Sequence, residues 1–201
     1  MTQVLVLYYS RSGNTRKLAQ QVARGIEAQG VEAVLRTVPE LPAYADGKIP
    51  DVSPNDPFVT RQDLLDCHGL ALGSPVRFGN MAAPLKQFID STSGEWLSGA
   101  LIDKPAAVFG AGSMLHGGQE TTLLTMTIPL LHHGMMLVGV PHSERALHTT
   151  EGGGSPYGAS SIAEPHHPLM ADEKQIAKTL GQRLARFAHT FHHHLSKRIE
   201  S

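Results

Sequence analysis

The chain has 201 residues, of which 41% are hydrophobic and 17% are charged, and its formal net charge is −1. This length allows a substantial core, and the hydrophobic content excludes a highly charged disordered chain. The nearly balanced charge argues against nucleic-acid binding, because binding to a polyanion requires a positively charged surface.

Cysteine usage and hydropathy bear on the compartment. Cys67 is the only cysteine, which excludes an internal disulfide and a cysteine-rich metal site and is typical of a reducing compartment. No signal peptide is evident, and the best candidate for a membrane span, residues 123–140, is interrupted by Pro129 and two adjacent histidines. We therefore expect a cytoplasmic protein without membrane insertion.

Predicted strands and helices alternate along the chain. Apolar runs predict five strands, at residues 3–9, 31–38, 69–73, 106–109 and 135–140. Apolar residues at helical spacing predict four helices, at residues 15–29, 81–92, 119–132 and 172–195, the last capped by Asp172. Two long loops are expected at about 39–62 and 141–171, where prolines or glycines are frequent.

This alternation predicts one α/β domain over residues 1–195, followed by a terminal tail at 196–201. Its strands should form a parallel sheet with right-handed crossovers. Ligands bind such sheets beyond the carboxyl ends of the strands. The loops at 10–15, 74–80 and 110–118 all follow predicted strands, so we expect them to lie at this edge.

The first of these loops has the composition of an anion site. Its side chains offer several hydroxyl and amide donors, and Gly13 allows the backbone to turn into the start of a helix. The loop contains neither a Gly-Lys-Ser/Thr sequence nor a dinucleotide-binding glycine pattern. Its donors suit a phosphomonoester. The alternative is an ordinary strand-to-helix turn capped by Asn14 or Thr15.

Several motifs, in order, resemble those of one family. Residues 8–15 (YYSRSGNT) resemble the phosphate loop of flavodoxin-like FMN proteins. Residues 74–84 (SPVRFGNMAAP), 117–120 (GGQE), 132–135 (HHGM) and 153–159 (GGSPYGA) resemble the WrbA-type NAD(P)H:quinone oxidoreductases. The resemblance covers about residues 3–190. It implies a flavodoxin-like fold, with helices on both faces of a five-stranded parallel sheet of order 2-1-3-4-5.

The resemblance also implies an activity and an assembly. Members bind FMN non-covalently, reduce quinones to hydroquinones with NADH or NADPH, and are typically homotetramers. The residues of this chain implied to contact FMN are Ser10, Arg11, Ser12, Gly13, Asn14, Thr15, Pro75, Val76, Arg77, Phe78, Gly79, Ala111, Gly112, Ser113, Met114, Leu115, His116, Gly117 and His132.

For individual side chains in the second and third loops, the sequence leaves two interpretations. Phe78 either forms an apolar wall for the flavin or belongs to the core, and Arg77 either donates to the ring or is a surface cation. Residues 114–116 are bulkier than the Thr/Gly-rich run expected in this family. His116 either hydrogen-bonds the edge of the flavin or is a solvated loop residue.

Two further residues are candidates for substrate binding and catalysis. From residue type alone, Trp96 is a core or interface anchor and His132 is a core or capping histidine. The resemblance places Trp96 over the flavin, where nicotinamide or quinone stacks. It places His132 beside the flavin of another subunit, as a catalytic residue that hydrogen-bonds the quinone or supplies a proton. Ser12 occupies a position where a relative carries an aromatic residue near the nucleotide substrate.

Two other histidine or cysteine features are interpreted as structural. His189 and His193 lie at i,i+4 spacing, but no cysteine or carboxylate partner is evident, so we predict a solvated helix end and no metal site. Cys67 adjoins a predicted buried strand and is expected to be structural.

Two alternative functions remain: a flavodoxin-type electron carrier and an FMN-binding regulatory module. Carriers generally use a strongly charged face to steer their partners, which a net charge of −1 does not favour. DNA binding by a regulatory module has only the basic pair Lys197 and Arg198 in its favour.

Overall fold

The computed structural model describes residues 1–42, 56–162 and 168–199, with a parallel sheet at its centre. The strands are β1 (Gln3–Tyr8), β2 (Glu32–Thr37), β3 (Leu70–Pro75), β4 (Pro105–Gly112), β5 (Met136–Leu137) and β6 (Ala159–Ile162). Their order is β2-β1-β3-β4-β5, and β6 also pairs with β4. This order confirms the predicted flavodoxin-like α/β fold.

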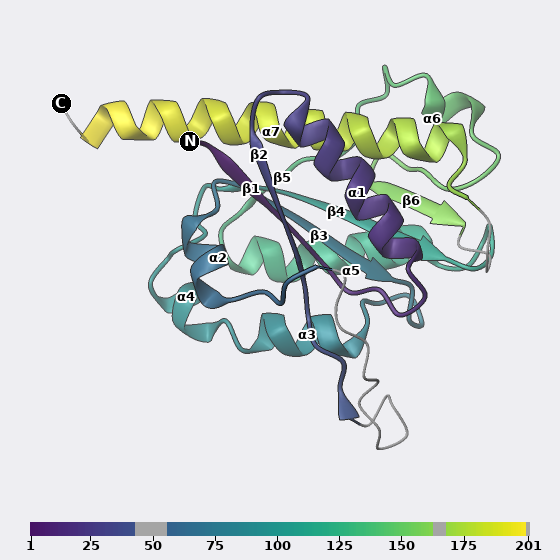
Figure 1. Ribbon diagram of the computed structural model, residues 1–201, viewed down its shortest axis with the longest axis horizontal. Helices are drawn as coiled ribbons and strands as arrows, with labels where there is room; N and C mark the ends of the chain where they lie inside the picture. Colours follow the sequence, from purple (N-terminus) through teal and green to yellow (C-terminus); the bar gives the residue numbers. More distant parts are fainter. Residues whose placement is uncertain (43–55, 163–167, 200–201) are drawn as a thin grey trace.

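Helices cover both faces of the sheet (Figure 1). The helices are α1 (Asn14–Glu27), α2 (Arg61–Asp66), α3 (Ala83–Asp90), α4 (Ser93–Leu97), α5 (Gln119–His132), α6 (Ala146–Thr149) and α7 (Ala171–Ile199). One core lies between the sheet and α1 with α7, and a second core lies between the sheet and α2, α3 and α5.

The two cores explain why β1 is a continuous apolar run. Val4, Val6 and Tyr8 pack toward α1 and α7, whereas Leu5 and Leu7 pack toward α3 and α5. Side chains alternate between the faces of a strand, so a strand covered on both sides must be apolar at every position. The same reasoning accounts for β4, all of whose residues are buried.

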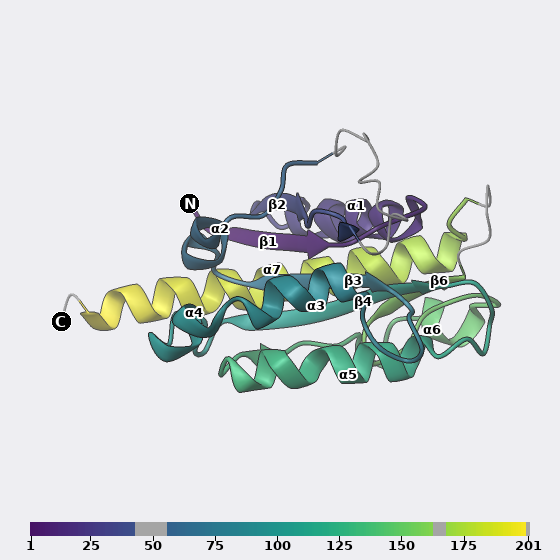
Figure 2. The ribbon, with the colours of Figure 1, turned by 90° about the horizontal axis from the view of Figure 1, so that it is seen from below.

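The last position of the sheet differs from the prediction. The strand expected at 135–140 is reduced to β5, and β6 lies inside the region expected to be a long loop. The cause is a contact with a later segment: the backbone N–H of Val140 donates to the carbonyl of Pro156 at 3.0 Å and not to β4. β6 then pairs with Phe109–Gly112, the second half of β4. Figure 2 shows β6 and α6 at the same end of the molecule.

Several predicted boundaries were also wrong. Ser74 and Pro75 end β3, and residues 110–112 end β4, whereas they were expected in loops. The proline is tolerated because it is the last residue of its strand. Asp172 lies in the first turn of α7 instead of capping it, and α7 continues beyond Leu195 to Ile199. The short helices α2, α4 and α6 were not predicted, and α6 lies inside the loop expected at 141–171. None of the helices in the described ranges combines the length and the apolar character that a membrane span requires.

Candidate functional site

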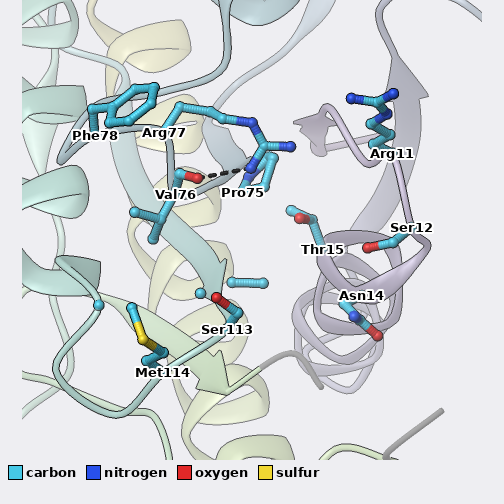
Figure 3. A pocket seen from close by; sticks show the side chains of 13 residues that line it. Arg11, Ser12, Asn14, Thr15, Pro75, Val76, Arg77, Phe78, Ser113 and Met114 are labelled. Carbon is cyan, nitrogen blue, oxygen red and sulfur yellow. Dashed lines mark hydrogen bonds between the residues drawn. The ribbon is translucent and has the colours of Figure 1, made fainter. Parts of the chain in front are cut away.

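The three loops converge on one cavity of about 370 Å³ at the carboxyl edge of the sheet (Figure 3). This confirms the prediction that they lie together. The cavity is lined by Arg11, Ser12, Asn14, Thr15, Pro75, Val76, Arg77, Phe78, Ala111, Gly112, Ser113, Met114 and Gly117. Its size is within the usual range for small-molecule sites.

Six residues expected to contact the cofactor are not among those lining the cavity: Ser10, Gly13, Gly79, Leu115, His116 and His132. The hydroxyl of Ser10 accepts a hydrogen bond from the backbone N–H of Arg16 at 3.3 Å, so it supports the turn into α1. Leu115 and His116 are exposed.

One end of the cavity is the amino terminus of α1. Gly13 is the N-cap, with a φ of 85° that favours glycine, and it has no side chain to cap the helix. The expected capping by Asn14 or Thr15 is therefore wrong, and the N–H of Arg16 in the first turn is bonded to the hydroxyl of Ser10. The first turn contains no acidic residue. Free backbone N–H groups, the positive end of the helix dipole and the nearby hydroxyls of Ser12 and Thr15 form a donor set suited to a phosphate dianion.

The second loop supplies the apolar part of the cavity. Phe78 is fully exposed and its φ of 52° lies in the left-handed region, which strains a non-glycine residue. It therefore does not belong to the core. The loop is held in place by two backbone hydrogen bonds of 2.9 Å between Arg77 and Asn80. The hydroxyl of Thr125 on α5 also donates to the carbonyl of Gly79 at 3.1 Å.

The third loop depends on a residue of the 117–120 motif to which the sequence analysis assigned no role. The buried Gln119, at the start of α5, donates from its side-chain amide to the carbonyl of Met114. A Cβ on Gly112 would lie 2.9 Å from the side chain of Gln119, so only glycine leaves room for this support. The missed signal is a polar residue directly after two glycines at the start of a helix.

Beside the first loop, Tyr8, Arg16 and Asp56 form a polar cluster whose members bond one another. Asp56 accepts hydrogen bonds from the hydroxyl of Tyr8 and from Nε of Arg16, the latter at 2.8 Å. Burial tends to raise the pKa of Asp56, but the bonds from Arg16 and Tyr8 outweigh it and hold that pKa below its usual range. Burial and the neighbouring Asp56 raise the pKa of Tyr8. Asp56 therefore neutralises Arg16 and leaves Tyr8 protonated.

Trp96 and His132 lie at a separate groove of about 400 Å³ between the α3–α4 region and α5. Trp96 donates from Nε1 to the carbonyl of His132 at 2.8 Å. Both residues are exposed, so neither is a core residue. α5 begins beside the cavity and has 14 residues, so His132 lies about 20 Å from its start. A single chain does not bring Trp96 or His132 to the cavity.

Next to them, His133 is buried and its Nε2 lies 2.9 Å from the hydroxyl of Thr92. Burial lowers the pKa of His133, so this imidazole is neutral near pH 7 and joins α5 to the end of α3.

The histidines of α7 are only partly solvated. His189 and His193 are exposed, as predicted, but the ring of His192 packs on that of His68 with centroids 3.7 Å apart. Within the described ranges, no three histidine, cysteine or acidic side chains are placed to hold a metal ion. Cys67 is buried, and burial raises the pKa of its thiol, which fits a structural role.

Comparisons with known proteins agree with this geometry. A WrbA-like flavodoxin from Agrobacterium tumefaciens has 20% identity and a TM-score of 0.68, with 94% of this chain and 99% of that chain covered. A flavodoxin from the domain Archaea has the same identity and coverage and a TM-score of 0.63. Flavodoxin 2 from Bacillus cereus has 20% identity and a TM-score of 0.59, covering 92% of this chain and 99% of that one. At this identity the structures establish the fold alone.

A family model provides the assignment. The model described as NADPH-dependent FMN reductase matches residues 2–148, which include all three loops of the cavity. The chain therefore belongs to the NADPH-dependent FMN reductase family.

Proposed function

We propose that the protein holds FMN in the cavity and uses it to reduce quinones to hydroquinones at the expense of NADPH or NADH. The observation that carries this proposal is that the amino terminus of α1, whose N-cap is a glycine, and an apolar slot line the same cavity at one edge of the sheet. Such a site accommodates a phosphate at one end and a flat aromatic ring at the other.

The residues fit this cofactor. The amino terminus of α1, with Ser12 and Thr15, would hold the phosphate. Val76 and Met114, on opposite loops, would contact the ring. FMN, when bound, accepts a hydride from the dinucleotide and passes two electrons to the quinone. The protein's part is to bind and orient the reactants, to exclude water and to supply a proton.

We further propose that this work is shared between subunits of a homotetramer. Trp96 and His132 would then approach the cavity of a neighbouring subunit, with the indole as a stacking surface and the imidazole as the proton donor to the quinone oxygen. Support comes from the apolar side chains that α5 exposes on this surface, namely Leu124, Ile128 and Leu131. Phe78, exposed beside the cavity, is a second surface that an assembly would cover.

One of two other functions is disfavoured by a particular observation. An electron carrier is expected to have a strongly charged docking face, and the chain has a net charge of −1. A reductase that releases reduced FMN is compatible with the family's description, and it differs in treating the flavin as a substrate.

The test is to purify the protein and record its visible spectrum before and after addition of FMN. Turnover of NADPH with benzoquinone is then measured after gel filtration. Flavin that stays with the protein, together with quinone-dependent oxidation of NADPH, is the expected result. Flavin that elutes separately, or turnover that requires added free FMN, would contradict the proposal.

A further inference from the structure

Two arginines stand at the opening of the cavity on loops far apart in the sequence. Arg11 follows β1 and Arg77 follows β3, and these strands are neighbours in the sheet with Tyr8 opposite Gly73. Both side chains line the cavity. Figure 3 shows the guanidinium of Arg77 directed toward the first loop. The topology therefore brings two permanent positive charges to one opening.

Neither guanidinium forms an ion pair with a carboxylate of the residues that the structure describes. Three other arginines do pair with carboxylates: Arg16 with Asp56, Arg36 with Asp63 and Arg61 with Glu95. Across residues 1–42, 56–162 and 168–199, no such ion pair includes Arg11 or Arg77. The side chain of Arg77 donates only to the carbonyl of Val76, at 2.8 Å.

Glu40, a carboxylate that acts on the same tyrosine as the two arginines, is held by other donors. The carboxylate of Glu40 accepts the hydroxyl of Tyr9 at 2.5 Å and the backbone N–H of Leu41 at 3.1 Å. Both guanidiniums act electrostatically on the same tyrosine, partly opposing the rise in its pKa. Two like charges that share one environment repel each other, and an anion between them removes this repulsion.

The phosphate of FMN does not require these arginines, because the amino terminus of α1 already supplies its donors. A second anion must therefore come from another reactant. We propose that Arg11 and Arg77 form an arginine clamp that holds a phosphate group of the nicotinamide dinucleotide. This inference rests on the proposed function. Guanidinium forks bind phosphate oxygens in pairs, and the dinucleotide offers a pyrophosphate and, in NADPH, a 2′-phosphate.

The experiment measures binding, with oxidised dinucleotides that do not react with oxidised flavin. Dissociation constants of NADP⁺ and NAD⁺ are determined by calorimetry on FMN-loaded wild type, Arg11→Ala and Arg77→Ala. Arg24→Ala is the matched control, because Arg24 is an exposed arginine in the last turn of α1, at the end of the helix remote from the cavity. FMN affinity of each apoprotein is measured in parallel by flavin fluorescence.

Each clamp variant should bind NADP⁺ about tenfold more weakly or worse, while Arg24→Ala stays within about twofold of wild type. A loss confined to NADP⁺ places the clamp on the 2′-phosphate, and an equal loss for NAD⁺ places it on the pyrophosphate. Unchanged affinity for both dinucleotides would overturn the clamp, as would a loss of FMN affinity alone. Wild type that retains no FMN would instead refute the proposed function, and the clamp with it.

Discussion

The indole N–H of Trp96 donates to the backbone carbonyl of His132 across 2.8 Å. This bond joins α4 to the last residue of α5 and fixes the indole of Trp96 next to His132, on a surface remote from the chain's own cavity. Trp96 and His132 lie next to each other but far from the cavity loops. This arrangement is a direct reason to test whether the active site is shared between subunits.

The first prediction concerns the phosphate end of the cavity. Replacing Ser12 and Thr15 together by alanine removes two hydroxyl donors to a dianion, at about 1.5–3 kcal/mol for each charged hydrogen bond. The affinity for FMN should fall at least tens-fold in calorimetric titrations of the apoprotein. Ser10→Ala should cause a smaller loss, because Ser10 bonds the backbone of Arg16 and does not line the cavity. Equal effects of the two changes would contradict this assignment.

The second prediction concerns the order of substrates. If one surface over the flavin serves the dinucleotide and the quinone in turn, the oxidised dinucleotide must leave before the quinone enters. Initial rates measured against NADPH at several fixed quinone concentrations should then give parallel double-reciprocal lines. Intersecting lines would mean that both substrates bind at once.

The third prediction separates the roles of Trp96 and His132 in that cycle. Trp96→Ala should slow both half-reactions, because the indole is proposed to stack on each substrate. His132→Ala should slow mainly the quinone half-reaction, by about 10–100-fold for a proton donor. Stopped-flow measurement of each half-reaction distinguishes these effects. A His132→Ala enzyme that is slow only with NADPH would refute the proton-donor role.

The fourth prediction concerns assembly. Light scattering on the FMN-loaded protein should give about four times the 21.6 kDa mass of the chain. Ile128→Lys should lower this mass, because it places a charge on the exposed apolar face of α5. Ile128 is 55% exposed, so the fold of the single chain should tolerate the change, as far-ultraviolet circular dichroism would verify. A wild-type mass near that of one chain would exclude the shared site.

The fifth prediction is a pH dependence of stability. Burial, followed by repulsion from His192, lowers the pKa of His68, and burial followed by His193 lowers that of His192. The folded protein therefore binds protons more weakly than the unfolded chain at these sites. Their contribution to stability is present above about pH 6.5 and is lost as the pH falls through the lowered values.

Thermal melting between pH 7.5 and 5.5 tests this sign. The melting temperature should drop with acidification in the wild type and drop less in His68→Gln, which removes one member of the pair. His142→Gln, at an exposed histidine outside this contact, should follow the wild type. A steeper decline in His68→Gln than in the wild type would show that the sign is wrong.

The sequence was most informative where structure follows from neighbouring residues. The apolar run of β1 and the glycine before α1 determine local conformation, and both were interpreted correctly. The contact of Gln119 with Met114 and that of Asp56 with Tyr8 were missed, because they depend on how distant segments meet. The division of the last strand was missed for the same reason, since the apolar residues Val138 and Val140 are buried without continuing the strand.

Because β5 and β6 pair with different halves of β4, the connection between them can vary in length. Both segments pair with β4, one with its first half and the other with its second half. All three loops of the cavity precede residue 118, and the match to the family ends at residue 148. The segment after residue 148 therefore supports the sheet, because β6 pairs with β4, and supports α1, because α7 packs against it. Insertions between β5 and β6 would lengthen the protein while leaving the cavity lining intact, which makes this connection a suitable point for grafting new peptide or for dividing the chain into complementing fragments.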